Sequence, residues 1–390
     1  MPYLDESWLD DARHLERCDS RDSLRALATA GAQVREAMTL AREAGVERTA
    51  DGERPRAVLV GALGGSAVVA DVLETFAQPG APVPVITRRD VPLPGWVGPL
   101  DLVVAVSLSG RAAGPLALAS EAARRGASLL TVGAADSPLA DVCARARGTH
   151  IPVGRGRTSS RTAMWSLLTP VLMAAGHLGL IDVTDSHLEQ AITHLDREAE
   201  VCRPSSEHFV NPAKLAALQL AGTVPMALAD GPVAAVAARR AASMFARTAR
   251  VPMTWGELPD AAASVVATLD GPFTAGGGSG AASAPDDIFA DPFLDAPRQP
   301  GLGLLSLHSD PEGAVSDLAG VAAGVQDSAF AAGATVVEVH PGDGPPIARL
   351  AELIQRVDFT ATYLALGQGL DPNVSRHVTQ LRDHLGDRRA

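Results

Sequence analysis

Short runs of apolar residues recur along the chain, and almost every one is followed by a stretch with helical spacing. The runs consist mainly of Val, Leu and Ala without polar alternation, which is typical of strands covered on both faces of a parallel sheet. We therefore predict strands at 56–61, 82–87, 101–107, 127–133 and 149–152 in the first half, and at 224–228, 262–268, 302–308 and 334–340 in the second.

Apolar residues three or four positions apart fill most of the intervals and predict helices. They lie at 5–45 (as two amphipathic helices), 67–76, 115–125, 136–147, 162–178, 186–202, 233–249, 313–332, 347–368 and 374–385. Strands that alternate with helices predict an α/β fold with mostly parallel sheets. Because the second half repeats the first more weakly, we expect two α/β/α sandwiches in tandem.

These segments predict the domain organisation of the 390 residues, a length sufficient for two full cores. Residues 1–50 form an N-terminal helical segment, 51–185 the first α/β domain, 186–204 a connecting helix and 205–390 the second domain. Residues 274–300 are rich in Gly, Ala, Ser, Pro and Asp with little periodicity, and we interpret them as a flexible insertion.

One predicted strand ends abruptly in Ser107-Leu-Ser109-Gly110 before a helix begins. The first backbone N–H groups and the dipole of such a helix attract an anion, and two hydroxyls add donors. The alternative is an ordinary turn in which the serines cap the helix. A second turn, Gly61 to Ser66, joins another strand to a helix in the same way. Ligands of parallel sheets bind at the carboxyl ends of the strands, which favours a phosphate site at these turns.

A polar loop, Arg155-Gly-Arg-Thr-Ser-Ser-Arg161, precedes the apolar helix predicted at 162–178. Three arginines and two serines at a helix start are consistent with an anion clamp in an acidic protein. The alternative interpretation is positive charge that remains solvated before a helix.

Composition narrows the expected partners. The net charge of −12, with 33 Lys and Arg against 45 Asp and Glu, argues against nucleic acid. No apolar run is long enough to span a bilayer, and the acidic residues 1–16 do not resemble a signal peptide. The spacing of Cys18, Cys143 and Cys202 fits no metal or disulfide pattern, so we expect the protein to be located in the reducing cytoplasm. Lys214 is the only lysine.

From about residue 20 to 388, the sequence resembles the sugar isomerase (SIS) domain proteins, specifically the bifunctional phosphoglucose/phosphomannose isomerases. The markers, which are weak singly and specific in their order, are Gly64-Gly-Ser66, Ser107-Leu-Ser-Gly110, Arg161 nine residues before Pro170, Asn211-Pro-Ala-Lys214, Val251-Pro with Gly256-Glu-Leu, and Leu381-Arg382 in the closing helix.

The resemblance implies two SIS domains that bind sugar phosphates and interconvert their aldose and ketose forms. It implies no metal or organic cofactor, and a homodimer with sites shared between subunits. By resemblance, Ser107, Ser109 and Gly110 would hold the phosphate, and Arg161 would stabilise the enediolate. The remaining implied substrate-binding residues are Gly65, Ser66 and Arg382, the last of which stands where the family has a lysine.

The sequence departs from the family at the positions that carry the chemistry. Ala112 replaces a threonine of the phosphate loop, which removes one hydroxyl donor. The family's basic glutamate falls on or beside Arg247, and residues 233–256 contain four arginines and no Asp or Glu. Asp260 occupies the position of the ring-opening histidine. A lost base removes a contribution on the order of 10²- to 10⁴-fold.

Other residues are candidates for the missing acid and base. Glu257 and Asp260 are the nearest carboxylates, and the alternative for them is a solvated turn. Glu207 with His208 forms a second pair, and the alternative is a helix cap at the domain start. His308, at a strand end, is a weaker candidate because such histidines are more often packed than catalytic. Three arginines, Arg247, Arg250 and Arg382, are candidates for binding a second anion. The alternative is that they lie on solvated helix faces.

Two functions therefore compete. The first is an active isomerase of glucose, mannose and fructose 6-phosphates with relocated acid and base groups. The second is a catalytically silent phosphosugar sensor or partner subunit, which the retained anion loops and the missing base favour. A deaminating or aminotransferring relative that uses an amine is disfavoured, because Lys214 is the only lysine.

Overall fold

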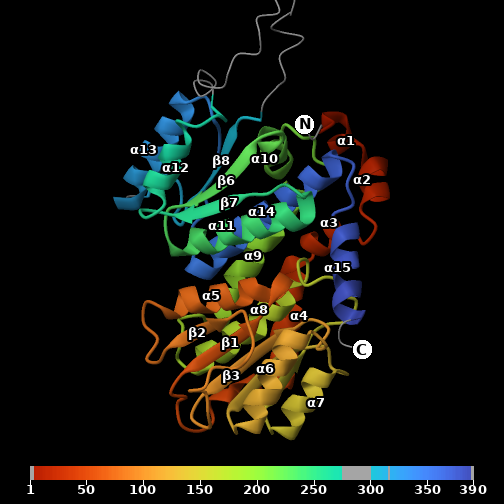
Figure 1. Ribbon diagram of the computed structural model, residues 1–390, viewed down its shortest axis with the longest axis vertical. Helices are drawn as coiled ribbons and strands as arrows, with labels where there is room; N and C mark the ends of the chain where they lie inside the picture. The colour runs from red at the N-terminus through yellow and green to blue at the C-terminus, as the bar shows by residue number, and fades with distance from the viewer. Residues whose placement is uncertain (1–3, 275–299, 315–316, 388–390) are drawn as a thin grey trace, which may run out of the picture. The chain divides into compact units, whose positions relative to one another are not determined.

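The chain forms two compact units, each built on one parallel sheet (Figure 1). The computed structural model describes residues 4–274, 300–314 and 317–387. The first-sheet unit comprises residues 26–200 and 341–352, and the second-sheet unit comprises residues 1–25, 201–340 and 353–390.

The first sheet has five parallel strands in the order β2-β1-β3-β4-β5. The strands are β1 (Val58–Ala62), β2 (Val85–Arg88), β3 (Leu102–Ser107), β4 (Ser128–Gly133) and β5 (Thr149–Pro152). The central strands β1 and β3 are buried throughout, because helices cover both faces. On one face, α6 (Ala113–Arg124) and α7 (Pro138–Arg145) pack on a core that includes Leu59 and Val103. The other face carries α4 (Ala30–Glu43), α5 (Ala67–Ala77) and α8 (Met164–His177).

The second sheet has four described parallel strands in the order β7-β6-β8-β9. They are β6 (Val224–Ala229), β7 (Thr254–Glu257), β8 (Leu302–Leu307) and β9 (Thr335–Val339). Met226 and Leu304 form a core with residues of α12 (Ala262–Thr268) and α13 (Asp317–Ala331). The unit also contains α10 (Pro212–Leu220), α11 (Pro232–Met244) followed by a π-helical turn (Phe245–Ala249), and α15 (Arg376–Asp387). α9 (Asp185–Val201) belongs to the first-sheet unit except for its last residue, and α14 (Pro346–Gly367) has its first residues in the first-sheet unit and the others, from 353, in the second-sheet unit.

The predicted fold class, with mostly parallel sheets flanked by helices, is confirmed. One predicted strand is wrong, because residues 262–268 form the helix α12. The edge of the described sheet beside β6 is instead occupied by β7, whose Thr254 pairs with Met226. The run is rich in alanine, which favours a helix, and only Val265 within it is buried in the core.

The N-terminal residues form four short helices instead of the two predicted. They are α1 (Glu6–Asp10), α2 (Ala12–Cys18), α3 (Ser23–Ala28) and α4. Asp5 and Asp11 accept hydrogen bonds from the backbone two residues later and thereby start α1 and α2 anew. The predicted 1–50 segment also divides between the units, since residues 1–25 belong to the second-sheet unit. The backbone N–H of Asp5 donates to Gly367 at the end of α14, which accounts for part of that assignment.

Two further expectations concern segments rather than single strands. Residues 275–299, which make up nearly all of the predicted insertion 274–300, lie outside the described residues. The limits 51–185, 186–204 and 205–390 stay predictions as domain boundaries.

Among the described residues, no helix combines the length and apolar character needed to cross a bilayer.

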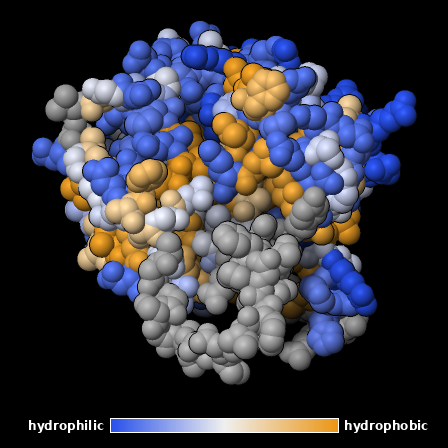
Figure 2. All heavy atoms as spheres, turned by 90° about the horizontal axis from the view of Figure 1, so that it is seen from above, coloured by the Kyte–Doolittle hydropathy of each residue, from blue (hydrophilic) through white to orange (hydrophobic). Residues whose placement is uncertain are grey.

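The surface mixes polar and apolar areas. Figure 2 shows orange apolar patches between blue hydrophilic ones on the face that it draws. In the second-sheet unit, Phe330 of α13 is 79% exposed, and Phe209 and Val210 before α10 are exposed to 62% and 63%. Apolar atoms make up a large share of any folded surface, so these side chains by themselves indicate no particular partner.

A buried ion pair joins two helices of the second-sheet unit. Arg240 of α11 is 4% exposed and Asp358 of α14 is 3% exposed. The guanidinium donates to both carboxylate oxygens, with distances of 2.9 Å from Nε to Oδ1 and 2.8 Å from Nη2 to Oδ2. Such a pair fixes the orientation of the two helices, and each partner alone would be an uncompensated buried charge.

We therefore expect Arg240→Met to lower the free energy of unfolding by about 3–5 kcal/mol, because Asp358 loses its counter-charge. Replacement of both partners, Arg240→Met with Asp358→Leu, should restore most of that loss, since no buried charge remains. Arg239→Met is the matched control. Arg239 is half-buried and lies 5.1 Å from the centre of the Trp255 ring, so this variant should lower the free energy of unfolding by only about 0.5–1 kcal/mol. Urea unfolding of the variants measures the difference. A double variant that is as unstable as Arg240→Met would contradict this explanation.

Candidate functional site

The first sheet reverses its strand order between β1 and β3, which lie side by side at its centre. From β1 the chain crosses to β2 on one side, and from β3 it continues to β4 and β5 on the other. Ligands of open parallel sheets bind in the crevice at the carboxyl ends of the two strands beside such a reversal. Ala62 pairs with Val106, so β1 and β3 end at nearly the same level. The loops after them therefore begin side by side.

The loop after β3 carries three of the predicted phosphate-binding residues. Ser107 is buried, and its Oγ accepts a 3.4 Å hydrogen bond from the Ala112 N–H. Ser109 Oγ accepts a 3.3 Å bond from the Arg111 N–H. Both bonds are longer than the usual range of about 2.7–3.2 Å, so a phosphate oxygen can compete for these N–H groups. The loop thus places two hydroxyls at the start of α6.

Glycine is required at Gly110 for two reasons. Its φ of +62° lies in the left-handed region that disfavours other residues. A Cβ at this position would also come within 2.1 Å of Ser137 Oγ. The backbone of the loop can therefore turn tightly beside the α7 start only because residue 110 has no side chain.

The loop after β1 carries Gly64, Gly65 and Ser66 into α5. Gly64 has a φ of +65°, and a Cβ there would meet no atom within 4 Å, so its role is conformational. The buried hydroxyl of Ser66 donates to the Leu63 carbonyl at 3.1 Å instead of capping the helix. Gly65 and Ser66 follow β1, the strand that pairs with β3, and their assignment to one site with the Ser107 loop stays a prediction.

The two helices at the strand reversal begin without a side-chain cap. Neither Ser66 before α5 nor Ala112 before α6 accepts a capping hydrogen bond from the first turn. By contrast, Ser137 caps α7 by accepting from the Ala140 N–H at 3.3 Å. Uncapped first turns leave backbone N–H groups and the positive end of the helix dipole for an anion. The serines of these loops are therefore not serving as helix caps.

The arginine loop before α8 is only partly available for an anion. Arg157 pairs with Glu36 of α4 at 2.5 Å, which ties the loop to its own unit. Arg161 lies three residues before α8, and its backbone N–H donates to Ser159 Oγ at 3.3 Å. The predicted clamp of three arginines therefore has one member committed to an ion pair, and the role of Arg161 stays a prediction.

The remaining predicted residues lie in the second-sheet unit. Glu257 is the last residue of the edge strand β7 and is partly buried, whereas Asp260 is exposed on the turn before α12. Among the described contacts, no hydrogen bond joins the two carboxylates. Arg382 lies on α15, and its side chain is outside what the structure describes. The catalytic role of Glu257 and Asp260 stays a prediction.

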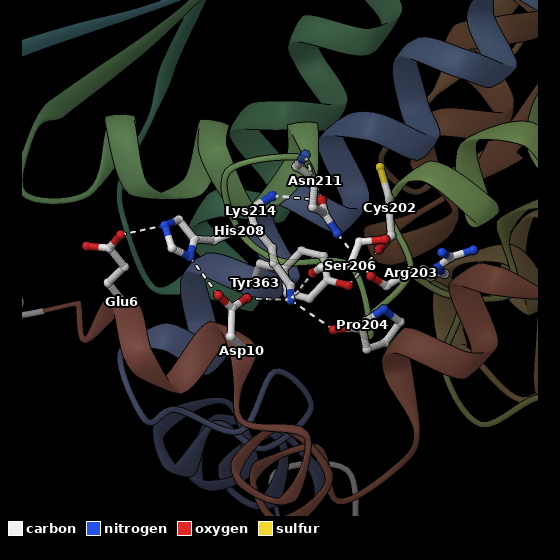
Figure 3. Close-up of polar contacts among 11 residues, drawn as sticks. Glu6, Asp10, Cys202, Arg203, Pro204, Ser206, His208, Asn211, Lys214 and Tyr363 are labelled. Atoms are coloured by element: carbon white, nitrogen blue, oxygen red, sulfur yellow. Dashed lines mark hydrogen bonds and ion pairs between the residues drawn. The ribbon is translucent and has the colours of Figure 1, made fainter.

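Two other candidates have structural roles. His208 lies between two N-terminal carboxylates, with Nε2 2.5 Å from Glu6 and Nδ1 2.6 Å from Asp10 (Figure 3). It therefore pairs with α1 and not with Glu207. Arg250 donates to the backbone carbonyls of Asp371 and Val374, and burial lowers its pKa. This arginine holds the loop before α15 in place.

Lys214 is fully buried and fixes the start of α10 (Figure 3). Its Nζ donates to Asp10 at 3.1 Å and to two backbone carbonyls of the preceding loop at 2.8 and 2.7 Å, and it lies 5.5 Å from the centre of the Tyr363 ring. Burial lowers the pKa of Lys214, although Asp10 opposes that shift. Burial alone would raise the pKa of Asp10, but hydrogen bonds from His208 and Lys214 lower it overall. All three donor positions of the amine are occupied, which suits a structural role.

Sequence reasoning missed a polar group at the carboxyl edge of the second sheet. Asp230 directly follows β6 and His308 directly follows β8, and the two buried side chains are 2.6 Å apart. The sequence pattern marks His308 only as an isolated candidate. The detectable signal is that polar residues immediately follow two strands, but the sequence does not show that those strands are neighbours.

Comparison with known proteins agrees with this architecture. Residues 209–385 match the family described as the bacterial phospho-glucose isomerase C-terminal SIS domain. A curated relative, the bifunctional phosphoglucose/phosphomannose isomerase of Caldicellulosiruptor bescii, is 29% identical over 169 residues. That alignment covers 43% of this chain and 49% of the relative, so it spans about half of the relative's length.

Solved structures with little sequence identity share the fold. A hypothetical protein of Thermus thermophilus matches with a TM-score of 0.67 and 14% identity, over 100% of this chain and 99% of that one. A glucose-6-phosphate isomerase of Chlamydia trachomatis matches with a TM-score of 0.62 and 12% identity, over 90% of this chain and 72% of that one. The C-terminal domain of the Francisella tularensis glucosamine-fructose-6-phosphate aminotransferase matches with a TM-score of 0.59 and 11% identity, over 90% and 98%.

The domain match and the curated relative agree with the sequence markers: residues 209–385 match the bacterial phospho-glucose isomerase C-terminal SIS domain, and the chain is similar to a bifunctional phosphoglucose/phosphomannose isomerase.

Proposed function

We propose that the chain binds a sugar phosphate at the carboxyl ends of β1 and β3, with the phosphate at Ser107, Ser109 and Gly110. The observation that carries the proposal is the pair of uncapped helix starts, α5 and α6, beside the reversal of strand order. Gly65 and Ser66 would then line the sugar. Binding of glucose, mannose and fructose 6-phosphates is the expectation from the family.

Aldose–ketose isomerisation is the activity that this site would support. A base removes the proton from the hydroxyl-bearing carbon beside the carbonyl, an enediolate forms, and the proton returns to the former carbonyl carbon. No electrons are exchanged with another molecule. Arg161 would face the negative enediolate oxygen, and Glu257 with Asp260 would serve as base and acid. We propose that this activity requires no organic cofactor and that the chain acts in the cytoplasm as a homodimer.

A catalytically silent phosphosugar sensor or partner subunit is the second candidate. It is favoured by the replacement of the family's glutamate and histidine, and by the exposed position of Asp260 on its turn. In that case the phosphate loops would be retained for binding, and no proton would be transferred.

Removal of the loop hydroxyls tests the binding site. Hydrogen bonds to charged groups contribute about 1.5–3 kcal/mol each, so Ser107→Ala and Ser109→Ala should each weaken glucose 6-phosphate binding about tenfold or more. Ser120→Ala, at an exposed position further along α6, is the matched control and should bind normally. Isothermal titration calorimetry gives the affinities, and melting temperatures show that the variants are folded. If the variant that combines Ser107→Ala and Ser109→Ala is folded and binds glucose 6-phosphate with unchanged affinity, the phosphate assignment is refuted.

The coupled isomerase assay separates the two candidate functions. If Glu257 is the base, Glu257→Gln should lower turnover on the order of 10²- to 10⁴-fold while glucose 6-phosphate binding persists. Asp260→Asn should impair turnover as well. Asp270→Asn, an exposed carboxylate shortly after α12, is the control and should turn over normally.

The possible outcomes of this assay are distinct. Turnover that survives both substitutions would exclude these catalysts. Binding without any turnover by the unmodified chain would support the silent sensor. Neither binding nor turnover with the three 6-phosphates would argue against a phosphosugar ligand.

A further inference from the structure

The carboxyl edge of the second sheet gathers imidazole and carboxylate groups from neighbouring strands. His308 directly follows β8, Glu338 is the penultimate residue of β9, and His340 directly follows β9. Ser306 pairs with Glu338, so His308 and His340 continue the register of the same two strands. Residues two apart on a strand share one face of the sheet. The three side chains therefore come from one face and one edge.

The distances between these groups suit a shared ion better than direct hydrogen bonds. Glu338 Oε2 is 3.8 Å from His308 Nε2 and 3.7 Å from His340 Nε2, both beyond hydrogen-bond length. The potential ligand atoms of the three residues all lie within 4.8 Å of one another. With metal–ligand bonds of about 2.0–2.2 Å, tetrahedral ligand atoms are separated by roughly 3.3 Å. Rotation of the His340 ring and a small movement of Glu338 would be needed to bring the three atoms to that separation.

Asp230 orients the His308 ring in a way that suits metal binding. Its Oδ2 lies 2.6 Å from His308 Nδ1, and its Oδ1 accepts a 2.5 Å hydrogen bond from the Ser309 N–H. A carboxylate on Nδ1 holds the proton there and leaves the lone pair of Nε2 outward, which is the usual arrangement behind a metal-bound histidine. The Gln326 amide lies 3.2 Å from that Nε2, and the Ser306 hydroxyl lies 3.3 Å from it. An ion would take the place of these two partners.

His340 has room to reorient. Its ring stacks on His308 at 3.9 Å between centroids with 6° between planes, so both rings cannot direct in-plane lone pairs at one ion as they stand. His340 Nδ1 is buried without a hydrogen-bond partner among the described residues, and its Nε2 faces Glu338 Oε2. Rotation of this one ring is therefore opposed mainly by the stacking. The side chains of His340 and Glu338 are 29% and 49% exposed, which gives an ion access from solvent.

We propose that His308, Glu338 and His340 form a binding site for one divalent transition-metal ion, with Zn²⁺ as the best match and Asp230 as the residue that orients His308. Two imidazole nitrogens and one carboxylate oxygen suit zinc, and three protein ligands leave a fourth position for water or another ligand. The site does not depend on the proposed phosphosugar function, because its residues belong to a different sheet and are none of the proposed phosphate ligands or catalysts.

The alternative is a purely protein cluster in which a protonated His308 pairs with Asp230 and Glu338. That cluster also holds the strand ends together, and it needs no ion. It predicts that Zn²⁺ has no specific effect on the folded chain. The two alternatives therefore differ in a direct binding measurement.

The test uses the full chain after treatment with a chelator and desalting. Titration with ZnCl₂ in a calorimeter should show one ion per chain, and Zn²⁺ should raise the melting temperature. Co²⁺ should give the visible absorption of a tetrahedral nitrogen and oxygen site. His340→Ala and Glu338→Gln should each weaken Zn²⁺ binding at least tenfold, and loss of the outer carboxylate in Asp230→Asn should weaken it about 10- to 100-fold. MgCl₂ should bind far more weakly, because Mg²⁺ prefers oxygen ligands.

Two control variants guard against other zinc ligands. His377→Ala removes an exposed histidine of α15, and Cys18→Ser removes the partly exposed thiol that lies 3.6 Å from His14. Both should bind Zn²⁺ as the unmodified chain does. The proposal is overturned if Zn²⁺ does not bind, if either control abolishes binding, or if His340→Ala and Glu338→Gln bind normally while melting temperatures show that they are folded.

Discussion

Both units depend on the burial of parallel strands on their two faces. β1, β3 and β8 are buried along their whole length, so their interiors can hold only apolar or small side chains. Polar chemistry is thereby confined to the strand ends, where the chain leaves the sheet and a helix begins. The same constraint places the Ser107 loop at the carboxyl edge of the first sheet and the Asp230–His308 pair at the carboxyl edge of the second sheet. The positions of the two proposed sites thus follow from how parallel strands must be covered.

The two edges carry opposite electrostatic character. At the first sheet, the loops before α5 and α6 carry serine hydroxyls, and both helices begin without a side-chain cap, which suits the proposed anion. At the second sheet, two carboxylates and two imidazoles gather within a few residues of the strand ends, which suits a cation. The acidic overall charge of −12 therefore does not describe either site. The charged groups that would bind a ligand are those placed at the strand ends.

Several charged residues of the second-sheet unit hold the fold together. Lys214 ties α1 to the start of α10, and Arg250 secures the loop before α15. Arg240, one of the four arginines at 233–256, is neutralised by Asp358 within the core. Their partners come from segments more than a hundred residues away in the sequence. A local pattern shows that a charge is present but not whether another segment neutralises it.

The sequence alone was sufficient for the α/β class, for every described strand except β7, and for the glycine-containing loops after β1 and β3, because buried strands and glycine turns are local patterns. It failed at 262–268, where an apolar run suits either a strand or a helix; these residues form α12, and β7 pairs with β6 at the sheet edge. The order β7-β6-β8-β9, which makes His308 a neighbour of Glu338 and His340, was decided by tertiary structure. Strand order depends on which crossovers pack against which face, and that is a property of the whole chain.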